Sequence, residues 1–202
     1  IEAYTLPAGV IQTLLREAGA GRHGLVTHIG LHTFADPRNG GGACNALAST
    51  PLVEVIRLGG RELLWYHPIH VDVALVRGTA ADPQGNLTSR EEPADMDAFA
   101  AAMAAHNCGG QVFAQVRDRL DAPIVPARDV SVPGVLVDAV CLAPDQRQTT
   151  GGTYDPRMAG LTHAPATGAT PVLPEGLRYL IPRRAARALA PRPAVNFGFG
   201  VP

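Results

Sequence analysis

The chain contains no lysine, few aromatic residues and only three cysteines. All 17 of its basic residues are arginine, and they nearly balance 18 acidic residues, which gives a formal net charge of −1. Without a basic excess or a run of positive charge, the chain has no electrostatic footprint for nucleic acid or for an anionic membrane. We therefore expect neither of them as a partner.

The number and spacing of the cysteines limit which classes of protein the chain can belong to. Cys44, Cys108 and Cys141 lie far apart, so the chain has neither a disulfide framework nor a Cys-x-x-Cys pair for zinc. A reducing cytoplasm is the expected location. The sequence shows no apolar run of membrane-spanning length and no charged leader with an apolar core. With 202 residues, 46% of them apolar, the chain is long enough for a sizeable core.

The first part of the chain alternates a helix with short β-rich runs. Residues 7–20 carry apolar side chains at helical spacing, and Pro7 suits a first turn. Strand patterns follow at residues 25–29, 53–58 and 62–66. A long glycine-rich loop over residues 30–45 comes after the first of these strands. Gly59-Gly60-Arg61 between the other two indicates a β-hairpin.

The middle of the chain has the pattern of an α/β sheet. The near-continuous apolar run 71–76 predicts a central parallel strand covered on both faces. Residues 93–107 predict a helix that ends at Gly109-Gly110. Its expected apolar face consists of Met96, Phe99, Ala100 and Met103. Further strands are expected at 111–116 and 134–142. The predicted fold class is α/β, an open and mostly parallel sheet flanked by helices.

Apolar periodicity is lost between residues 144 and 174, which predicts an interdomain connection. We expect residues 1–143 to be the C-terminal part of a first domain, 144–175 a linker, and 176–202 the start of a second domain. A helix pattern returns at 177–189, with Pro182 either kinking it or marking its start. The last residues, Asn196-Phe-Gly198-Phe-Gly200-Val-Pro202, form a strand pattern running into a glycine turn. We therefore expect the chain to be an internal fragment, truncated at both ends.

The loop 30–45 is the most unusual local sequence. Its glycines, Gly40 to Gly42, let backbone N–H groups approach a ligand closely, and Asp36 and Arg38 can hold the loop through a charge-assisted hydrogen bond. The alternative is a merely flexible turn. The loop lacks the lysine of a phosphate-binding P-loop.

Two other segments contain possible functional residues. His67, His70 and Asp72 suggest a metal site, but their spacing matches no familiar ligand set. Arg77 and Thr79 directly follow the predicted central strand, at the edge where open α/β sheets bind ligands. Residues 82–86 after them are expected to form a polar turn.

Taken together, these segments resemble family I coenzyme A transferases of the acetate/propionate and 3-oxoacid branch. The resemblance rests on ordered matches along the whole chain. They are Ile1-Glu2-Ala3-Tyr4, Thr33-Phe34-x-Asp36-Pro37-Arg38 with Asn45, Arg77-Gly78-Thr79-x-x-Asp82-x-x-Gly85-Asn86, Gly109-Gly110, Pro133-Gly134-x-x-Val137-Asp138, Tyr154-Asp155-Pro156, Arg183-Arg184-Ala185-Ala186 and Asn196-x-Gly198-x-Gly200.

The resemblance implies a ping-pong reaction that moves CoA between a short-chain acyl-CoA and a carboxylic acid such as acetate, propionate or a 3-oxoacid. A glutamate carboxylate would be the nucleophile, and coenzyme A thioester would be a substrate, with no permanently bound cofactor and no metal. The implied nucleophile lies in a Glu-x-Gly segment beyond Pro202, so the chain holds no catalytic residue and is expected to be inactive alone. The implied CoA- and acyl-binding residues are Gly30, Thr33, Phe34, Gly40, Gly41, Gly42, Asn45, Arg77, Thr79, Asn196, Gly198 and Gly200.

The partners implied are acyl-CoA and small carboxylic acids, and the full-length protein is expected to be a homo-oligomer. Two positions depart from the family pattern: Ala8 stands where glutamine is usual, and Ala43 where lysine is common. These changes favour an alternative, a non-catalytic ligand-binding or regulatory domain of the same fold. A metal-dependent hydrolase built on His67, His70 and Asp72 is a third hypothesis.

Overall fold

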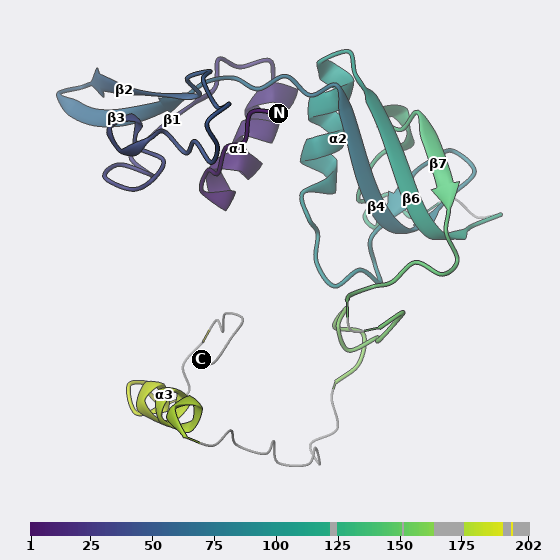
Figure 1. The fold of residues 1–202 in the computed structure, drawn as a ribbon. Helices are drawn as coiled ribbons and strands as arrows, with labels where there is room; N and C mark the ends of the chain where they lie inside the picture. Colours follow the sequence, from purple (N-terminus) through teal and green to yellow (C-terminus); the bar gives the residue numbers. More distant parts are fainter. Residues whose placement is uncertain (122–124, 151, 164–175, 192–194, 196–202) are drawn as a thin grey trace. The chain divides into compact units, whose positions relative to one another are not determined.

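The computed structural model describes residues 1–121, 125–150, 152–163, 176–191 and 195. Contacts divide the chain into two units, residues 1–162 and residues 163–202. The described part of the first unit contains two sheets and two α-helices, and that of the second contains one helix (Figure 1).

The first unit begins with α1 (Ala8–Gly19), which the sequence predicted. Beside it lies an antiparallel sheet in the order β1-β3-β2, made of β1 (Leu25–Thr27), β2 (Val53–Leu58) and β3 (Arg61–Tyr66). The predicted hairpin is confirmed: β2 and β3 pair in register from Val53↔Tyr66 to Leu58↔Arg61. Gly59 and Gly60 alone form the turn, both at positive φ, as a tight two-residue hairpin requires.

The second sheet has the order β5-β4-β6-β7, with β4 (Val73–Ala81), β5 (Leu87–Thr88), β6 (Gln111–Arg119) and β7 (Ala139–Leu142). β6 pairs parallel to both β4 and β7, whereas β5 is an antiparallel edge strand. The α/β class with parallel strands is thus confirmed. The separate antiparallel sheet of the first part was not predicted, and the expected strand 134–142 is split into a 3₁₀ turn, Gly134–Leu136, and β7.

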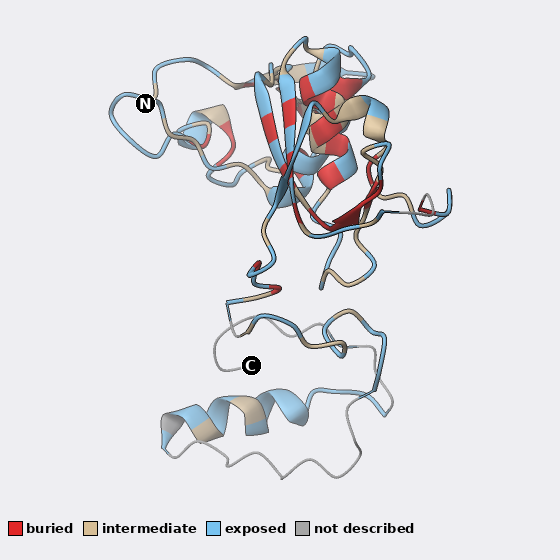
Figure 2. Cartoon of the chain, turned by 90° about the vertical axis from the view of Figure 1, so that its right-hand side faces the viewer, coloured by how far each residue is buried: buried red, intermediate tan, exposed pale blue. Residues whose placement is uncertain are grey.

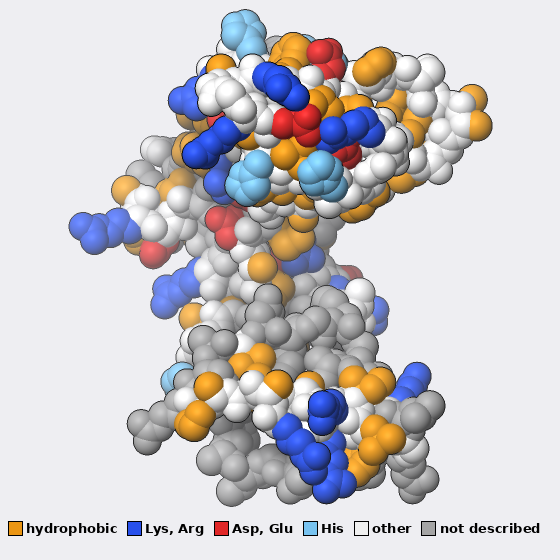
Figure 3. Space-filling view, turned by 90° about the vertical axis from the view of Figure 1, so that its left-hand side faces the viewer, with side chains coloured by type: hydrophobic (Ala, Val, Ile, Leu, Met, Phe, Trp, Pro, Cys, Tyr) orange, Lys and Arg blue, Asp and Glu red, His pale blue; other side chains and the backbone are white. Residues whose placement is uncertain are grey.

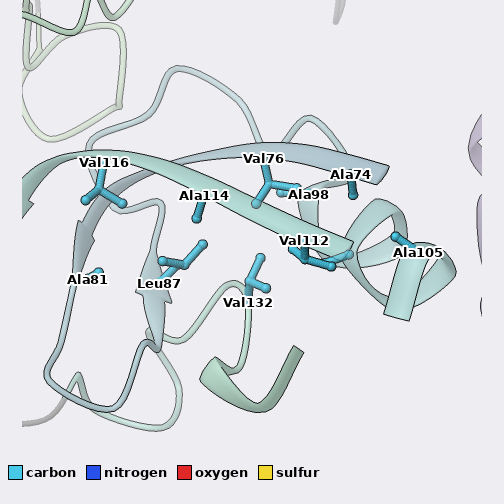
Figure 4. Close-up of a cluster of buried hydrophobic side chains, with 11 residues drawn as sticks. Ala74, Val76, Ala81, Leu87, Ala98, Ala105, Val112, Ala114, Val116 and Val132 are labelled. Atoms are coloured by element: carbon cyan, nitrogen blue, oxygen red, sulfur yellow. The ribbon is translucent and has the colours of Figure 1, made fainter. Parts of the chain in front are cut away.

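α2 (Ala98–Asn107) connects β4 to β6 and covers one face of this sheet. Small side chains make the close approach possible, because Ala98, Ala102 and Ala105 belong to the buried cluster between helix and sheet; Figure 4 labels the first and the last of them. The predicted helix began at residue 93 and placed Met96 on its buried face, which is wrong. Met96 lies before the helix and is 82% exposed, since an alanine face, not the bulkier side chains, fits against the sheet.

The other face of the same sheet is open in its amino-terminal half. Buried and exposed residues alternate along the first part of β4 and of β6, as Figure 2 shows. Leu75 is 81% exposed, and its register partner Phe113 is also exposed. The prediction that the run 71–76 is covered on both faces is therefore wrong for the described residues, although β4 does lie inside the sheet.

Two hydrophobic clusters hold the first unit together. One lies between α2 and the β4–β6 sheet and includes Val76, Leu87, Val112 and Val132. The second packs α1 against the antiparallel sheet through Val10, Leu14, Leu64 and Tyr66. Contacts between α1 and α2 join the two parts of the unit; Asn107 donates a hydrogen bond to the Gly19 carbonyl oxygen at 2.6 Å.

The described helix of the second unit, α3 (Leu177–Ala186), contains Pro182 in its interior, so this proline does not mark its start. Arg183 and Arg184 occupy the last turn, where positive charge complements the helix dipole. No helix among the described residues is long and apolar enough to cross a membrane.

Candidate functional site

A buried carboxylate organises the glycine-rich loop. Asp36 is 0% exposed and caps the 3₁₀ turn Pro37–Asn39. Its Oδ2 accepts hydrogen bonds from the His32 N–H at 2.8 Å and from the Arg38 guanidinium at 2.6 Å. Its Oδ1 accepts from the Arg38 backbone N–H at 3.0 Å and from Nε at 2.8 Å. A carboxylate that accepts four hydrogen bonds holds the loop in one conformation, so the loop is not a merely flexible turn.

The charge balance around Asp36 is consistent with this anchor. The Arg38 guanidinium holds the pKa of Asp36 well below its usual range, and the backbone donors act in the same direction, although burial opposes them. Arg38 also pairs with Glu62 at 2.9 Å, which ties the loop to β3. Burial, and secondarily the negative charge of Asp36, raise the pKa of Tyr66. The Tyr66 hydroxyl donates to the Ile29 carbonyl oxygen at 2.9 Å.

The remaining loop residues bond to one another. Thr33 Oγ1 donates to the Gly30 carbonyl oxygen at 2.8 Å, and the Gly42 N–H donates to the Phe34 carbonyl oxygen at 2.8 Å. Gly30 has φ 100°, and a Cβ there would collide with the Tyr66 hydroxyl. Glycine is thus required at this position by both backbone and packing.

The N-terminal segment closes over the same loop. The Glu2 carboxylate accepts four hydrogen bonds, from the backbone N–H and hydroxyl groups of Ser49 and Thr50. The Ser49 N–H, followed by the other three donors, lowers the pKa of Glu2 to about 2. Asn45 bonds to the Ile1 carbonyl oxygen at 3.0 Å. A cavity of about 220 Å³ lies beside this junction, and its lining includes Tyr4, Gly40, Gly41 and Ser49.

The hydrogen bonds of Glu2 to Ser49 and Thr50, here called the Glu2 clip, were not predictable from the sequence. Glu2 and its partners are 47 and 48 residues apart, and serine and threonine next to each other are common in turns, so no local pattern signals the contact.

Arg77 and Thr79 lie inside β4, not in a loop after it, so the prediction that they follow the strand is wrong. The ladder with β6 continues to Ala81. The Arg77 guanidinium pairs with Glu92 at 2.5 Å and donates to the carbonyl oxygens of Arg147 and Gln148. Thr79 is buried, and its hydroxyl accepts from the Glu91 N–H at 3.0 Å.

Two buried glutamines complete this network at the carboxyl ends of the parallel strands. Gln146 donates to the Gly78 carbonyl oxygen and to Glu92, and accepts from Gln115. Gln148 donates to the Glu91 carbonyl oxygen at 2.7 Å. Both glutamines come from the segment 144–175 that is expected to connect two domains. Gln146 and Gln148 bond to the sheet and to the residues that follow β5, and Gln148 Oε1 accepts from the Asp155 N–H at 2.8 Å.

The polar turn after β4 is confirmed. The Asp82 carboxylate accepts from the N–H groups of Gln84, Asn86 and Val125 and from the Asn86 amide, and Gly85 has φ 80°. Burial, the largest single influence, raises the pKa of Asp82, but the four hydrogen bonds together outweigh it, so the pKa lies below its usual value.

The described residues among those predicted to bind substrate lie in two places, the anchored loop and β4. Gly30, Thr33, Phe34, Gly40, Gly41, Gly42 and Asn45 share the anchored loop. No hydrogen bond or ion pair among the described residues joins this loop to Arg77 or Thr79. Asn196, Gly198 and Gly200 fall outside the described residues.

His67 and His70 lie between β3 and β4, in neither strand. His67 contacts Glu54 at 2.9 Å, whereas His70 contacts Asp72 at 3.4 Å, so they have different partners. Within the described part of the chain, no group of three or more His, Cys, Asp or Glu side chains could hold a metal ion. Acidic, arginine and histidine side chains are interspersed in the upper part of the view in Figure 3, with no large field of one sign.

The α/β sheet and the glycine-rich loop anchored by Asp36 are the features on which this chain can be compared with known proteins. The model of the coenzyme A transferase family matches residues 1–143. The chain belongs to this family. It is 43% identical over 202 residues to a caffeate CoA-transferase of Acetobacterium woodii, covering 98% of this chain and 38% of that protein.

Two further relatives agree. The acetate CoA-transferase YdiF of Escherichia coli (strain K12) is 34% identical over 201 residues, covering 100% of this chain and 38% of that protein. A crystal structure of the acyl-CoA transferase YdiF from E. coli O157:H7, a thioester complex with CoA, matches with a TM-score of 0.81 and 35% identity over 92% of this chain and 37% of that one. The chain thus spans about 38% of the length of the curated relatives it matches.

Proposed function

We propose that this chain is part of an enzyme that moves CoA between an acyl-CoA and a carboxylic acid, and that its glycine-rich loop lines the acyl site. The observation that carries the proposal is the loop itself, whose backbone is held by Asp36 and whose Gly40 is exposed, inside the segment that matches the family. Acetate, propionate and 3-oxoacids are the proposed acids. Because the relative at 43% identity is named for caffeate, we add aromatic acids to them.

We further propose a ping-pong route through a glutamate beyond Pro202. The carboxylate attacks the thioester carbonyl and expels CoA thiolate, which leaves an acyl-glutamyl anhydride. The thiolate then attacks the glutamyl carbonyl, releasing the first acid and forming a glutamyl-CoA thioester. The carboxylate of the second acid attacks the glutamyl-CoA thioester and expels the thiolate, which gives a second anhydride. The thiolate then attacks the acyl carbonyl of this anhydride, so that the second acid leaves as its CoA thioester and the glutamate is regenerated. Such chemistry requires a positioned nucleophile, N–H donors for the oxyanion, and remote binding energy.

The domain boundaries 1–143, 144–175 and 176–202, a homo-oligomer and a cytoplasmic location remain part of this proposal. The described cysteines, Cys44, Cys108 and Cys141, are all free thiols, which suits a reducing compartment.

The test is steady-state kinetics of the full-length enzyme with acetyl-CoA and a second acid. Parallel lines in double-reciprocal plots, together with a hydroxylamine-sensitive enzyme–CoA adduct, are the expected results. Residues 1–202 alone should show no acyl exchange; turnover by this chain would refute the placement of the nucleophile. The non-catalytic alternative, favoured by Ala8 and Ala43, predicts CoA binding without turnover by the full-length protein.

A further inference from the structure

One residue of the glycine-rich loop breaks its pattern. Five loop residues have a left-handed backbone, and four of them are glycine. The five are Gly30 (φ 100°), His32 (φ 64°), Gly40 (φ 106°), Gly41 (φ 59°) and Gly42 (φ 80°). A side chain is unfavourable in this conformation, so the histidine is the exception that needs a reason.

The fold does not require the imidazole of His32. The backbone N–H donates to Asp36, a bond that glycine would make equally well with less strain. The side chain is exposed and makes no hydrogen bond or ion pair with any described residue. By contrast Asp97, the other described non-glycine residue with positive φ, pairs with Arg16 at 2.7 Å. Strain kept without an internal partner is typical of residues that act on a ligand.

The loop carries a second exposed ring, that of Phe34, two residues after His32. Phe34 is 52% exposed, although it is a large apolar side chain on a well-anchored segment. The Phe34 carbonyl oxygen is held by the Gly42 N–H at 2.8 Å, and Asn39 donates to the Thr33 carbonyl oxygen at 3.1 Å. The loop therefore presents an imidazole and a phenyl ring from a preformed support.

These two side chains have complementary chemistry. A phenyl ring stacks against flat unsaturated groups, and an imidazole can donate a hydrogen bond to a hydroxyl or accept one from it. A substrate as small as acetate has no tail for either interaction.

We propose that His32 determines the specificity of the acyl site, and that His32 and Phe34 together select a carboxylic acid with a hydroxylated aromatic tail. The inference rests on the proposed CoA-transferase function and deepens it by naming the class of acid.

The test measures CoA transfer by the full-length enzyme from one acyl-CoA donor to 4-hydroxycinnamate, cinnamate or acetate. The readout is the ratio of kcat/KM for 4-hydroxycinnamate to kcat/KM for acetate. His32→Gly keeps the backbone and removes the imidazole, and it should lower this ratio at least tenfold. The cinnamate-to-acetate ratio should change little, because cinnamate lacks the hydroxyl. Phe34→Leu should lower both ratios.

Asp97→Gly is the matched control, since it also replaces a left-handed non-glycine residue, but at the N-cap of α2. It should leave the ratios unchanged. An unchanged 4-hydroxycinnamate ratio in His32→Gly, or an equal fall with all three acids, would overturn the specificity role. Wild-type enzyme that uses acetate but not 4-hydroxycinnamate overturns this inference alone. No transfer to any acid overturns the proposed function and the inference with it.

Discussion

The anchor of the loop can be tested by Asp36→Asn, a nearly isosteric change. The carboxylate accepts four hydrogen bonds, two from backbone N–H groups and two from the Arg38 guanidinium. Asparagine keeps one acceptor oxygen but turns an NH₂ group toward donors. The substitution thus removes the negative charge and places like hydrogen-bonding groups against each other at a fully buried position.

The loss can be estimated from these contacts. The Arg38 side chain is 47% exposed and keeps Glu62 as a second partner, so the cation left behind is neither buried nor unpaired. The cost therefore arises at the buried side chain of residue 36, where a polar group left without a partner costs about 1 to 3 kcal/mol. Each Asp36 oxygen accepts two hydrogen bonds, so the new NH₂ group faces two donors, and we take the upper end, about 3 kcal/mol, which corresponds to roughly a hundredfold change in the equilibrium for opening the loop.

Amide hydrogen exchange measures this opening directly. In the full-length protein at pH 7, protection of the His32 and Arg38 amides should fall about a hundredfold in Asp36→Asn. The matched control is Asp155→Asn, which removes the carboxylate from the more exposed pair with Arg157 and should change protection of the Arg157 amide only a few-fold. Unchanged protection at His32 would refute the view that Asp36 holds the loop.

The same anchor gives a pH dependence with a definite sign. The folded pKa of Asp36 is depressed, so its contribution is complete above the unfolded value of about 4 and is lost as pH falls below it. Loop protection in the wild type should decline at acidic pH, whereas the Asp36→Asn loop should show no such decline. A steeper acid loss in the variant would contradict this assignment.

Three further predictions concern other parts of the first unit. Gly30→Ala should destabilise the protein by at least about 2 kcal/mol in urea unfolding, because it combines a left-handed backbone with a collision at Tyr66. Gly59→Ala, where a Cβ meets open space, should cost only about 1 kcal/mol; equal losses would show that packing at Gly30 is irrelevant. Glu2→Gln should increase amide exchange at Ser49 and Thr50 at neutral pH. In the wild type the same increase should appear only as pH falls below about 4, toward the depressed pKa of Glu2 of about 2. Wild-type protection of these amides that is already lost at about pH 5 would contradict the Glu2 clip. Residues 1–202 alone should be poorly soluble because of the open sheet face, and Leu75→Gln should raise the soluble fraction several-fold; a soluble wild-type chain that melts cooperatively as a monomer would show that this face is harmless.

Elements with a local signal were predictable from the sequence. The hairpin of β2 and β3 follows from two β-rich runs around Gly59-Gly60, and α1 follows from apolar spacing after Pro7. The role of Asp36 was also within reach, since Asp36 and Arg38 lie two residues apart. What the sequence could not provide is that Asp36 is buried and accepts the His32 N–H, because this depends on how the loop packs against Tyr66.

The end of β4 shows why availability for a ligand was harder to predict than position. After Val76 the branched apolar residues stop, and Gly78 and two alanines follow, so β propensity ends before the strand does. The ladder continues because β6 supplies partners as far as Arg119, and Gln146 bonds the Gly78 carbonyl oxygen from 68 residues away. The same long-range contacts engage the Arg77 guanidinium. The Arg77 guanidinium, expected at the end of a strand, is thus held by Glu92 and two carbonyl oxygens. A ligand that approached this guanidinium would have to compete with those partners. The loop around Asp36 imposes no such competition on the exposed rings of His32 and Phe34, which is the physical reason for proposing that the loop recognises the acid.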